Sequence, residues 1–212
     1  MNYQILIADD HPLFRRALEE AIQPLGDEYE ITQADNFDDT LILLEENPDI
    51  DLVLLDLKMP GSEGLLGLIQ IRRAFPHVGV VIVSATQDAQ TVANAMREGA
   101  SGYVPKSTRF EKIQEAIPAV LSGKKWLPKE LEQAVADAKV DETAIQKLSL
   151  LTPKQLRVLV MIGKGYLNKQ IGAELDIKET TIKTHVSEIL RKLEIKNRTQ
   201  AALFTQFLDV DD

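Results

Sequence analysis

The sequence predicts an α/β unit with a five-stranded parallel, doubly wound sheet, followed by an all-α unit of four helices. Three observations favour this fold class. Five short apolar runs alternate with helical patterns up to residue 122, every pattern after Leu151 is helical, and acidic and basic residues separate between the two parts. Alternating strands and helices are typical of a parallel sheet that helices cover on both faces.

The strands of the first unit are expected at residues 4–8, 29–33, 52–55, 79–84 and 102–104. The third and fourth runs are almost continuously hydrophobic, which indicates strands buried on both faces. The helical stretches are expected at residues 12–23, 36–46, 64–75, 88–98 and 109–122. We predict the strand order 2-1-3-4-5, which places the first and third strands side by side where the order reverses.

The character of the chain changes after residue 122. Residues 130–139 are rich in Ala, Glu and Lys, a composition that favours a short helix. We therefore predict one domain at residues 1–122, a partly helical linker at 123–148 and a second domain at 149–212. The stiffness of the linker is left open by the sequence.

The second unit begins with Thr152, Pro153 and Gln155, which together form a capping box with proline at the first helical position. Further helices are expected at residues 168–175, 180–193 and 199–208. The third helix carries apolar residues at positions 182, 186, 189, 190 and 193 and basic or hydroxyl residues on the opposite side. Two helices joined by a short break, the second amphipathic and basic, describe a helix-turn-helix.

Charge separates the two parts. Residues 1–148 carry 14 basic and 25 acidic side chains, a balance of −11, whereas residues 149–208 carry 10 and 5, a balance of +5; the last four residues add −3 and give the net −9. The basic part is the candidate for binding nucleic acid. Cysteine is absent, which excludes disulfides and thiolate chemistry. We expect no membrane span and no signal peptide, and hence a cytoplasmic protein.

Polar residues lie at or just after the carboxyl ends of several predicted strands. Asp9 and Asp10 follow the first strand, Asp56 follows the third, Ser84 ends the fourth and Lys106 follows the fifth. Three carboxylates in one crevice need a divalent cation, and Mg²⁺ suits oxygen ligands. Asp56 is then available as a nucleophile that forms an acyl phosphate, with Lys106 and Ser84 stabilising phosphoryl oxygens. One Asp at a strand end is often only a loop residue or a helix cap, so the prediction depends on the agreement of all five.

Residues 1–122 resemble the receiver domain of bacterial two-component response regulators. The matching motifs are Ala8-Asp9-Asp10-His11, residues 56–61 (DLKMPG), Ser84-Ala85 and residues 102–106 (GYVPK). The resemblance implies that Asp56 is the phosphoacceptor and that Ser84 and Tyr103 are a switch pair, Tyr103 turning inward. It implies that Mg²⁺ is bound by Asp10, Asp56 and the backbone carbonyl of Lys58, with Asp9 contributing through water.

Residues 150–208 resemble the LuxR-type helix-turn-helix, through the motifs at residues 151–153 (LTP), 168–171 (NKQI), 181–186 (TIKTHV), 190–193 (LRKL) and 197–201 (NRTQA). Together the two halves resemble the NarL/FixJ subfamily over nearly the whole chain. We expect base contacts from Lys183, Thr184 and Ser187. Phosphate contacts are expected from Lys169, Lys192, Lys196 and Arg198, and Thr180 and Arg191 complete the predicted DNA-binding set. The alternative is that these basic residues form only a solvated helix face.

The function expected from both halves is phosphorylation-dependent regulation of transcription. A sensor histidine kinase would phosphorylate Asp56. This would either release the second unit from the first or favour a homodimer, which would then bind double-stranded promoter DNA. Leu203, Phe204 and Phe207 in the last helix are candidates for the dimer surface or for plain core. No enzyme activity is expected beyond self-phosphorylation and self-dephosphorylation at Asp56.

The sequence leaves three alternative functions. A haloacid-dehalogenase-like hydrolase would need a second Asp two residues after the nucleophile, where this chain has Lys58. A small-molecule sensor, such as the autoinducer-binding LuxR proteins, would need an aromatic-lined pocket in place of an acidic edge. A receiver that works without phosphate remains the third alternative, and only a measurement of phosphate transfer separates it from the preferred function.

Overall fold

The structure is a computed structural model that describes residues 2–62, 64–138, 147–148 and 150–205. Its contacts divide the chain into two compact units, whose described parts are residues 2–138 and residues 147–205 with the gaps just given. Within these described ranges, no helix combines the length and the apolar character needed to cross a membrane.

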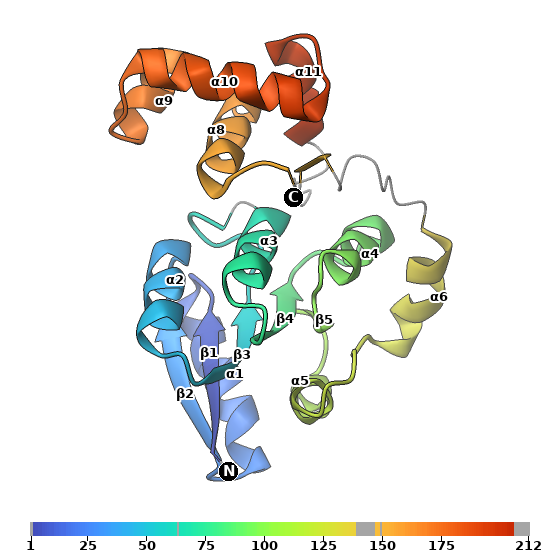
Figure 1. Cartoon of the computed structure of the whole chain (residues 1–212). Helices are drawn as coiled ribbons and strands as arrows, with labels where there is room; N and C mark the ends of the chain where they lie inside the picture. The colour runs from blue at the N-terminus through green and yellow to red at the C-terminus, as the bar shows by residue number, and fades with distance from the viewer. Residues whose placement is uncertain (1, 63, 139–146, 149, 206–212) are drawn as a thin grey trace. The chain divides into compact units, whose positions relative to one another are not determined.

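The first unit contains a five-stranded sheet in the order β2-β1-β3-β4-β5, which confirms the predicted fold class and strand order (Figure 1). All neighbouring strands are parallel. The strand bounds lie within two residues of the predicted ones. The strands are β1 (Tyr3–Ala8), β2 (Tyr29–Ala34), β3 (Ile50–Leu55), β4 (Gly79–Ser84) and β5 (Gly102–Pro105).

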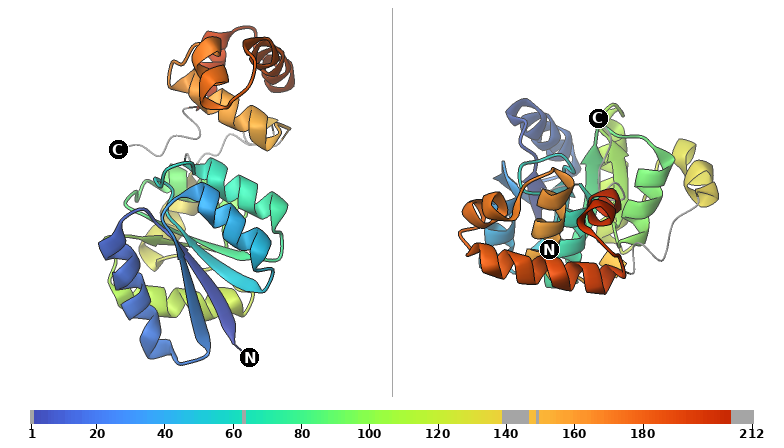
Figure 2. Two further views of the ribbon diagram at one scale, coloured as in Figure 1. Left: turned by 90° about the vertical axis from the view of Figure 1, so that its left-hand side faces the viewer. Right: turned by 90° about the horizontal axis from the view of Figure 1, so that it is seen from above.

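Helices cover both faces of this sheet (Figure 2). They are α1 (Pro12–Ile22), the 3-10 helix η1 (Gln23–Leu25), α2 (Phe37–Glu46), α3 (Leu65–Ala74), α4 (Ala89–Arg97) and α5 (Phe110–Leu121). Successive strand residues point to opposite faces, so Ile5 and Ile7 pack in one core with α1 and α5, whereas Leu6 and Ala8 pack in the other with α2, α3 and α4. We call these the α1–α5 core and the α2–α4 core.

After α5 the chain returns to the sheet and forms a short helix, α6 (Lys129–Asp137), that packs against α4. A helix was predicted at residues 130–139, of which residue 139 lies outside the described part. Leu131 and Val135, one turn apart, are half-buried against the α2–α4 core, while the other side chains of α6 are exposed. The segment predicted as a linker therefore contributes to the packing of the first unit.

The second unit is helical, as predicted, with α8 (Pro153–Gly163), α9 (Asn168–Glu174), α10 (Glu179–Leu193) and α11 (Arg198–Phe204). The capping box between Thr152 and Gln155 is present at the start of α8. Gly172 brings α9 close to the turn before α10, since a Cβ there would lie 2.6 Å from the carbonyl oxygen of Ile177. The predicted last helix extended to residue 208; residues 206–208, including Phe207, lie outside the described residues.

Candidate functional site

The carboxyl ends of β1, β3, β4 and β5 bring the predicted polar residues together. Ala8 of β1 pairs with Leu55 of β3, so the residues that follow them, Asp9 and Asp56, leave the sheet side by side. The backbone N–H of Asp56 donates to the carbonyl of Ala8 at 2.8 Å, and the N–H of Lys106 donates to the carbonyl of Ser84 at 2.7 Å. These hydrogen bonds continue the parallel ladder by one residue beyond the strands. They therefore hold the backbone of Asp56 and Lys106 in place at the edge of the sheet.

Lys106 lies between two buried carboxylates. Its ammonium nitrogen is 2.6 Å from Oδ2 of Asp9 and 2.7 Å from Oδ2 of Asp56, whose side chains are only 1% and 2% exposed. Burial alone would lower the pKa of Lys106, but its hydrogen bonds and charge interactions with Asp56 and Asp9 outweigh burial and raise that pKa. The other oxygen of Asp56, Oδ1, accepts a hydrogen bond from the backbone N–H of Lys58 at 3.1 Å.

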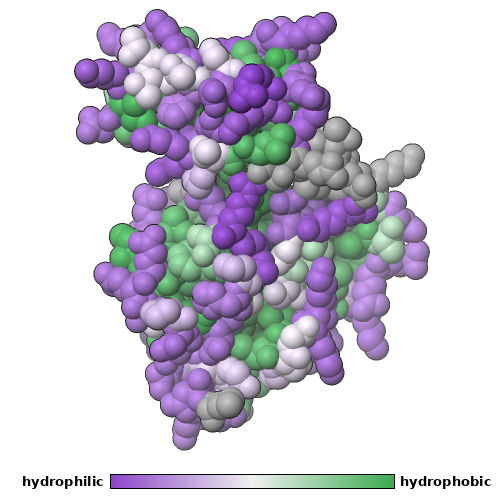
Figure 3. Space-filling model, in the orientation of Figure 1, coloured by the Kyte–Doolittle hydropathy of each residue, from purple (hydrophilic) through white to green (hydrophobic). Residues whose placement is uncertain are grey.

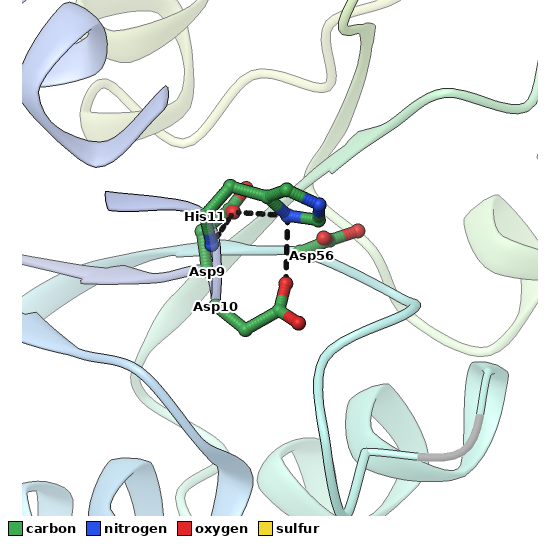
Figure 4. Close-up of side chains that lie close together, drawn as sticks. All are labelled: Asp9, Asp10, His11 and Asp56. Carbon is green, nitrogen blue, oxygen red and sulfur yellow. Dashed lines mark hydrogen bonds and ion pairs between the residues drawn. The ribbon is translucent and has the colours of Figure 1, made fainter. Parts of the chain in front are cut away.

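The acidic cluster is suited to a hard cation (Figure 4). Nδ1 of His11 lies 2.7 Å from Oδ1 of Asp10 and 3.2 Å from Oδ1 of Asp9. Ligand atoms of these three residues and of Asp56 all lie within 4.8 Å of one another. Oδ2 of Asp9 lies against the ammonium of Lys106, and Oδ1 of Asp10 lies against Nδ1 of His11. Both oxygens are buried, and no other donor among the described residues reaches them. Convergent carboxylate oxygens with free lone pairs fit Mg²⁺.

The predicted switch residues are both fully buried. The hydroxyl of Ser84 accepts a hydrogen bond from the N–H of Thr86 at 3.3 Å, and the hydroxyl of Tyr103 donates to the carbonyl of Thr86 at 2.8 Å. Burial, more than any nearby charge, raises the pKa of Tyr103 to about 12. Tyr103 therefore stays protonated at any physiological pH, and in this structure its ring already lies inward.

Sequence reasoning missed two residues of α1 that shape the site. The phenyl ring of Phe14 lies beneath Lys106, with the ammonium 4.7 Å from the ring centroid. Arg15 donates to the backbone carbonyl of Asp9 at 2.6 Å. A crevice of about 510 Å³ opens here, lined by His11, Leu13, Phe14, Ala17, Asp56, Lys58, Ala85 and Lys106. The only sequence signal for Phe14 and Arg15 was that their helix begins immediately after the acidic cluster.

In the second unit, α10 presents the predicted base-contacting side chains to solvent. Lys183, Thr184 and Ser187 are exposed, as are Thr180 and Arg191, and Lys169 is exposed on α9. The opposite side of α10 is buried through Ile182, Ile189 and Leu193. In the view of Figure 3, hydrophilic residues predominate on the surface of this unit. The polar side of α10 is therefore not used in the packing of the second unit.

Two of the predicted phosphate-contacting residues make hydrogen bonds within the second unit. The ammonium of Lys192 donates to the carbonyl of Leu150 at 3.0 Å and to Oε1 of Gln155 at 2.7 Å. The guanidinium of Arg198 donates to Oδ1 of Asn168 at 3.0 Å and to the carbonyl of Tyr166. These contacts connect α10 to the start of α8 and α11 to the start of α9. They give both residues a structural role that basic patterning did not predict.

Lys192→Met is expected to destabilise the second unit by about 1–2 kcal/mol, because methionine keeps the aliphatic stem but leaves the Leu150 carbonyl and the Gln155 amide oxygen without their charged donor. Thermal or urea unfolding would measure the loss. Arg191→Met, at a neighbouring exposed position of α10, is the matched control and should change stability little. Equal stability of both variants would contradict the structural role of Lys192.

Comparison with protein families gives two matches. The model of the response regulator receiver domain matches residues 5–118, and the model of the luxR family of bacterial regulatory proteins matches residues 149–205. The first includes every predicted residue of the acidic site, and the second includes α8 to α11. Together the two matches span most of the chain.

Whole-length relatives agree with both matches. The chain is 44% identical over 213 residues to the glycerol metabolism activator of Pseudomonas putida, covering 98% of this chain and 96% of the relative. It is 33% identical over 202 residues to the nitrate/nitrite response regulator protein NarL of Escherichia coli K12, covering 94% and 93%. A solved RcsB–DNA complex matches with a TM-score of 0.61 at 21% identity, covering 99% of this chain and all of that one, and supports the fold.

Proposed function

This chain belongs to the two-component response regulators that join a receiver domain to a LuxR-type helix-turn-helix domain, and from that premise we propose that Asp56 is its phosphoacceptor. A member of this family is a phosphorylation-dependent DNA-binding regulator rather than a conventional enzyme. One observation carries the assignment of Asp56: its buried carboxylate lies at the end of β3, ion-paired with Lys106 and beside Asp9. The division into domains at residues 1–122, 123–148 and 149–212 is part of the same proposal.

The proposed reaction is a phosphoryl transfer to a carboxylate. An oxygen of Asp56 attacks the phosphorus of a donor, an acyl phosphate bond forms, and the bond from phosphorus to the donor atom breaks with its electron pair leaving on the donor. We propose a histidine side chain of a sensor kinase as that donor. Lys106 is placed to neutralise a phosphoryl oxygen, and Ser84 to donate a hydrogen bond to another.

We propose Mg²⁺ as the cation of the acidic cluster, held by Asp10, Asp56 and the backbone carbonyl of Lys58, with Asp9 acting through water. Bound there, Mg²⁺ supplies positive charge to the oxygens of the transferring group. The supporting observation is the convergence of carboxylate oxygens of Asp9, Asp10 and Asp56, whose ligand atoms lie within 4.8 Å of one another. His11 offers a nitrogen at the same cluster, but Mg²⁺ prefers oxygen, so we assign it no ligand role.

Asp10→Asn is expected to raise the Mg²⁺ concentration needed for half-maximal phosphorylation by about tenfold or more, because the amide loses the charge that binds the cation. Titrating Mg²⁺ at fixed acetyl phosphate and measuring intact mass would give this value. Asp27→Asn, at an exposed acid outside the cluster, is the charge-matched control. Unchanged Mg²⁺ dependence in Asp10→Asn would remove Asp10 from the proposed ligands.

The output of the proposed switch is DNA binding by the second unit. The added phosphate brings negative charge and strong acceptors, and Ser84 and Tyr103 respond to it. We propose that this favours a homodimer whose two α10 helices enter neighbouring major grooves of promoter DNA, with Lys183, Thr184 and Ser187 at base edges. Such a regulator would work in the cytoplasm, where chromosomal DNA is accessible.

Selection of DNA from a random library, with and without beryllofluoride plus Mg²⁺, tests the function as a whole. We expect enrichment of a two-fold-related sequence, and tighter binding to it when beryllofluoride is present. Analytical ultracentrifugation of the protein–DNA complex would give the number of protein chains bound to each DNA site. Enrichment that is identical with and without beryllofluoride would instead favour a receiver that works without phosphate.

A further inference from the structure

Residues 124–137, which we call the strap, follow α5 and join the outer edge of the sheet. The backbone N–H of Trp126 donates to the carbonyl of Ser101 at 3.0 Å, and its carbonyl accepts from the N–H of Tyr103 at 3.2 Å. Trp126 thus makes a parallel bridge beside Gly102 in β5. Gly102 permits this close approach, since a Cβ there would lie 3.2 Å from the Trp126 carbonyl oxygen. The strap therefore pairs with the start of the outer edge of β5.

Side chains of the strap pack on both faces of the sheet. Trp126 is half-buried against the α1–α5 core, and the next residue, Leu127, against the α2–α4 core, as expected for extended chain. Leu131 and Val135 continue onto the α2–α4 core, and α6 lies beside α4 (Figure 1). The ammonium of Lys125 donates to the carbonyl of Met96 near the end of α4 at 3.4 Å.

The strap is joined to a switch residue through that residue's own backbone. Tyr103 bonds through its hydroxyl to the loop after β4, at Thr86, and through its N–H to Trp126 in the strap. A change in the position of Tyr103 therefore acts on both segments. Among the described residues of α6, Leu131 and Val135 are half-buried and the rest are exposed, so its contact with α4 is small enough to be changed by a small shift of α4 or β5.

We propose that the strap responds to the state of the acidic site: phosphorylation at Asp56 shifts α4 and the loop after β4, which Tyr103 contacts at Thr86, and the strap, with Trp126 and α6, changes its packing in response. This inference rests on the proposed function of Asp56 and goes beyond it, because it assigns residues 124–137 a signalling role. The strap continues directly into the segment that leads to the second unit. A displacement of the strap would therefore be passed along the backbone toward the second unit.

Trp126 is the sole tryptophan of the chain, so its fluorescence reports on the strap alone. We would add beryllofluoride and Mg²⁺ to the full-length protein, follow binding by fluorine NMR, and record the emission maximum and acrylamide quenching of Trp126. The expected result is a shift of the emission maximum and a changed quenching constant that saturate together with beryllofluoride binding.

Two variants with the same charge change sharpen the test. Leu131→Asp places a carboxylate on the buried side of α6 and should give the altered emission before beryllofluoride is added, with little further response. Ala134→Asp places it on the exposed side and should respond as the unmodified chain does. Beryllofluoride binding without any change at Trp126, or an unaltered response in Leu131→Asp, would overturn the strap inference and leave the function of Asp56 standing. Absence of beryllofluoride binding would overturn both.

Discussion

Asp56→Asn is expected to abolish formation of the acyl phosphate and, with it, the phosphorylation-dependent part of DNA affinity. The amide is not a useful nucleophile, and it lacks the charge that pairs with Lys106 at 2.7 Å. Incubation with acetyl phosphate and Mg²⁺, followed by intact-mass measurement, should show a phosphorylated species for the unmodified chain and none for the variant. Binding to the selected DNA should then be the same with and without acetyl phosphate.

This result needs a folded variant to be meaningful. Asparagine has nearly the same volume as aspartate, and Lys106 keeps Asp9 as a partner at 2.6 Å, so the fold is expected to survive. Asp49→Asn, at an exposed acid just before β3, provides the control for loss of one charge. Acyl phosphate that still forms in Asp56→Asn, mapped by peptide mass to Asp9 or Asp10, would refute the assignment of the nucleophile.

The fold of the first unit could be predicted because its sequence signals are redundant. Each strand is an apolar run of strand length, each is followed by a helical pattern, and parallel strands must place their carboxyl ends at one edge. That argument alone brought Asp9, Asp56 and Lys106 together, and the structure places them within ion-pair distance. The contributions of Phe14 and Arg15 were not predictable in this way, since they depend on how α1 is oriented over the crevice.

The strap and the basic side chains of the second unit show where sequence reasoning stops. The strap lies in the predicted, partly helical linker, because the character of the chain changes after residue 122 and residues 130–139 are rich in Ala, Glu and Lys. Its packing depends on Trp126, Leu127 and two apolar positions one turn apart in α6. Lys192 and Arg198 have the pattern of phosphate contacts, but long side chains can bend back to bind a carbonyl of their own unit. Residue type gives the charge of such a group, and only tertiary structure gives its partner.

Lys183→Ala is expected to weaken binding to the selected DNA by about 1–3 kcal/mol and to relax base preference at one position of each half-site, because this side chain lies early on the exposed face of α10. Lys183 is ion-paired with Glu179 at 2.9 Å, but an exposed pair one turn apart contributes only about 0.3–0.5 kcal/mol, so the ammonium is readily released to DNA.

Lys169→Ala, on α9, is the comparison variant. It should weaken binding to specific and random DNA about equally and lower the salt dependence of binding, as expected for a phosphate contact. Binding titrations at several salt concentrations, on selected and random duplexes, separate the two effects. If Lys183→Ala weakens both duplexes to the same extent, Lys183 contacts the backbone, and base recognition has to be reassigned to Thr184 and Ser187, the other two predicted base-contacting residues.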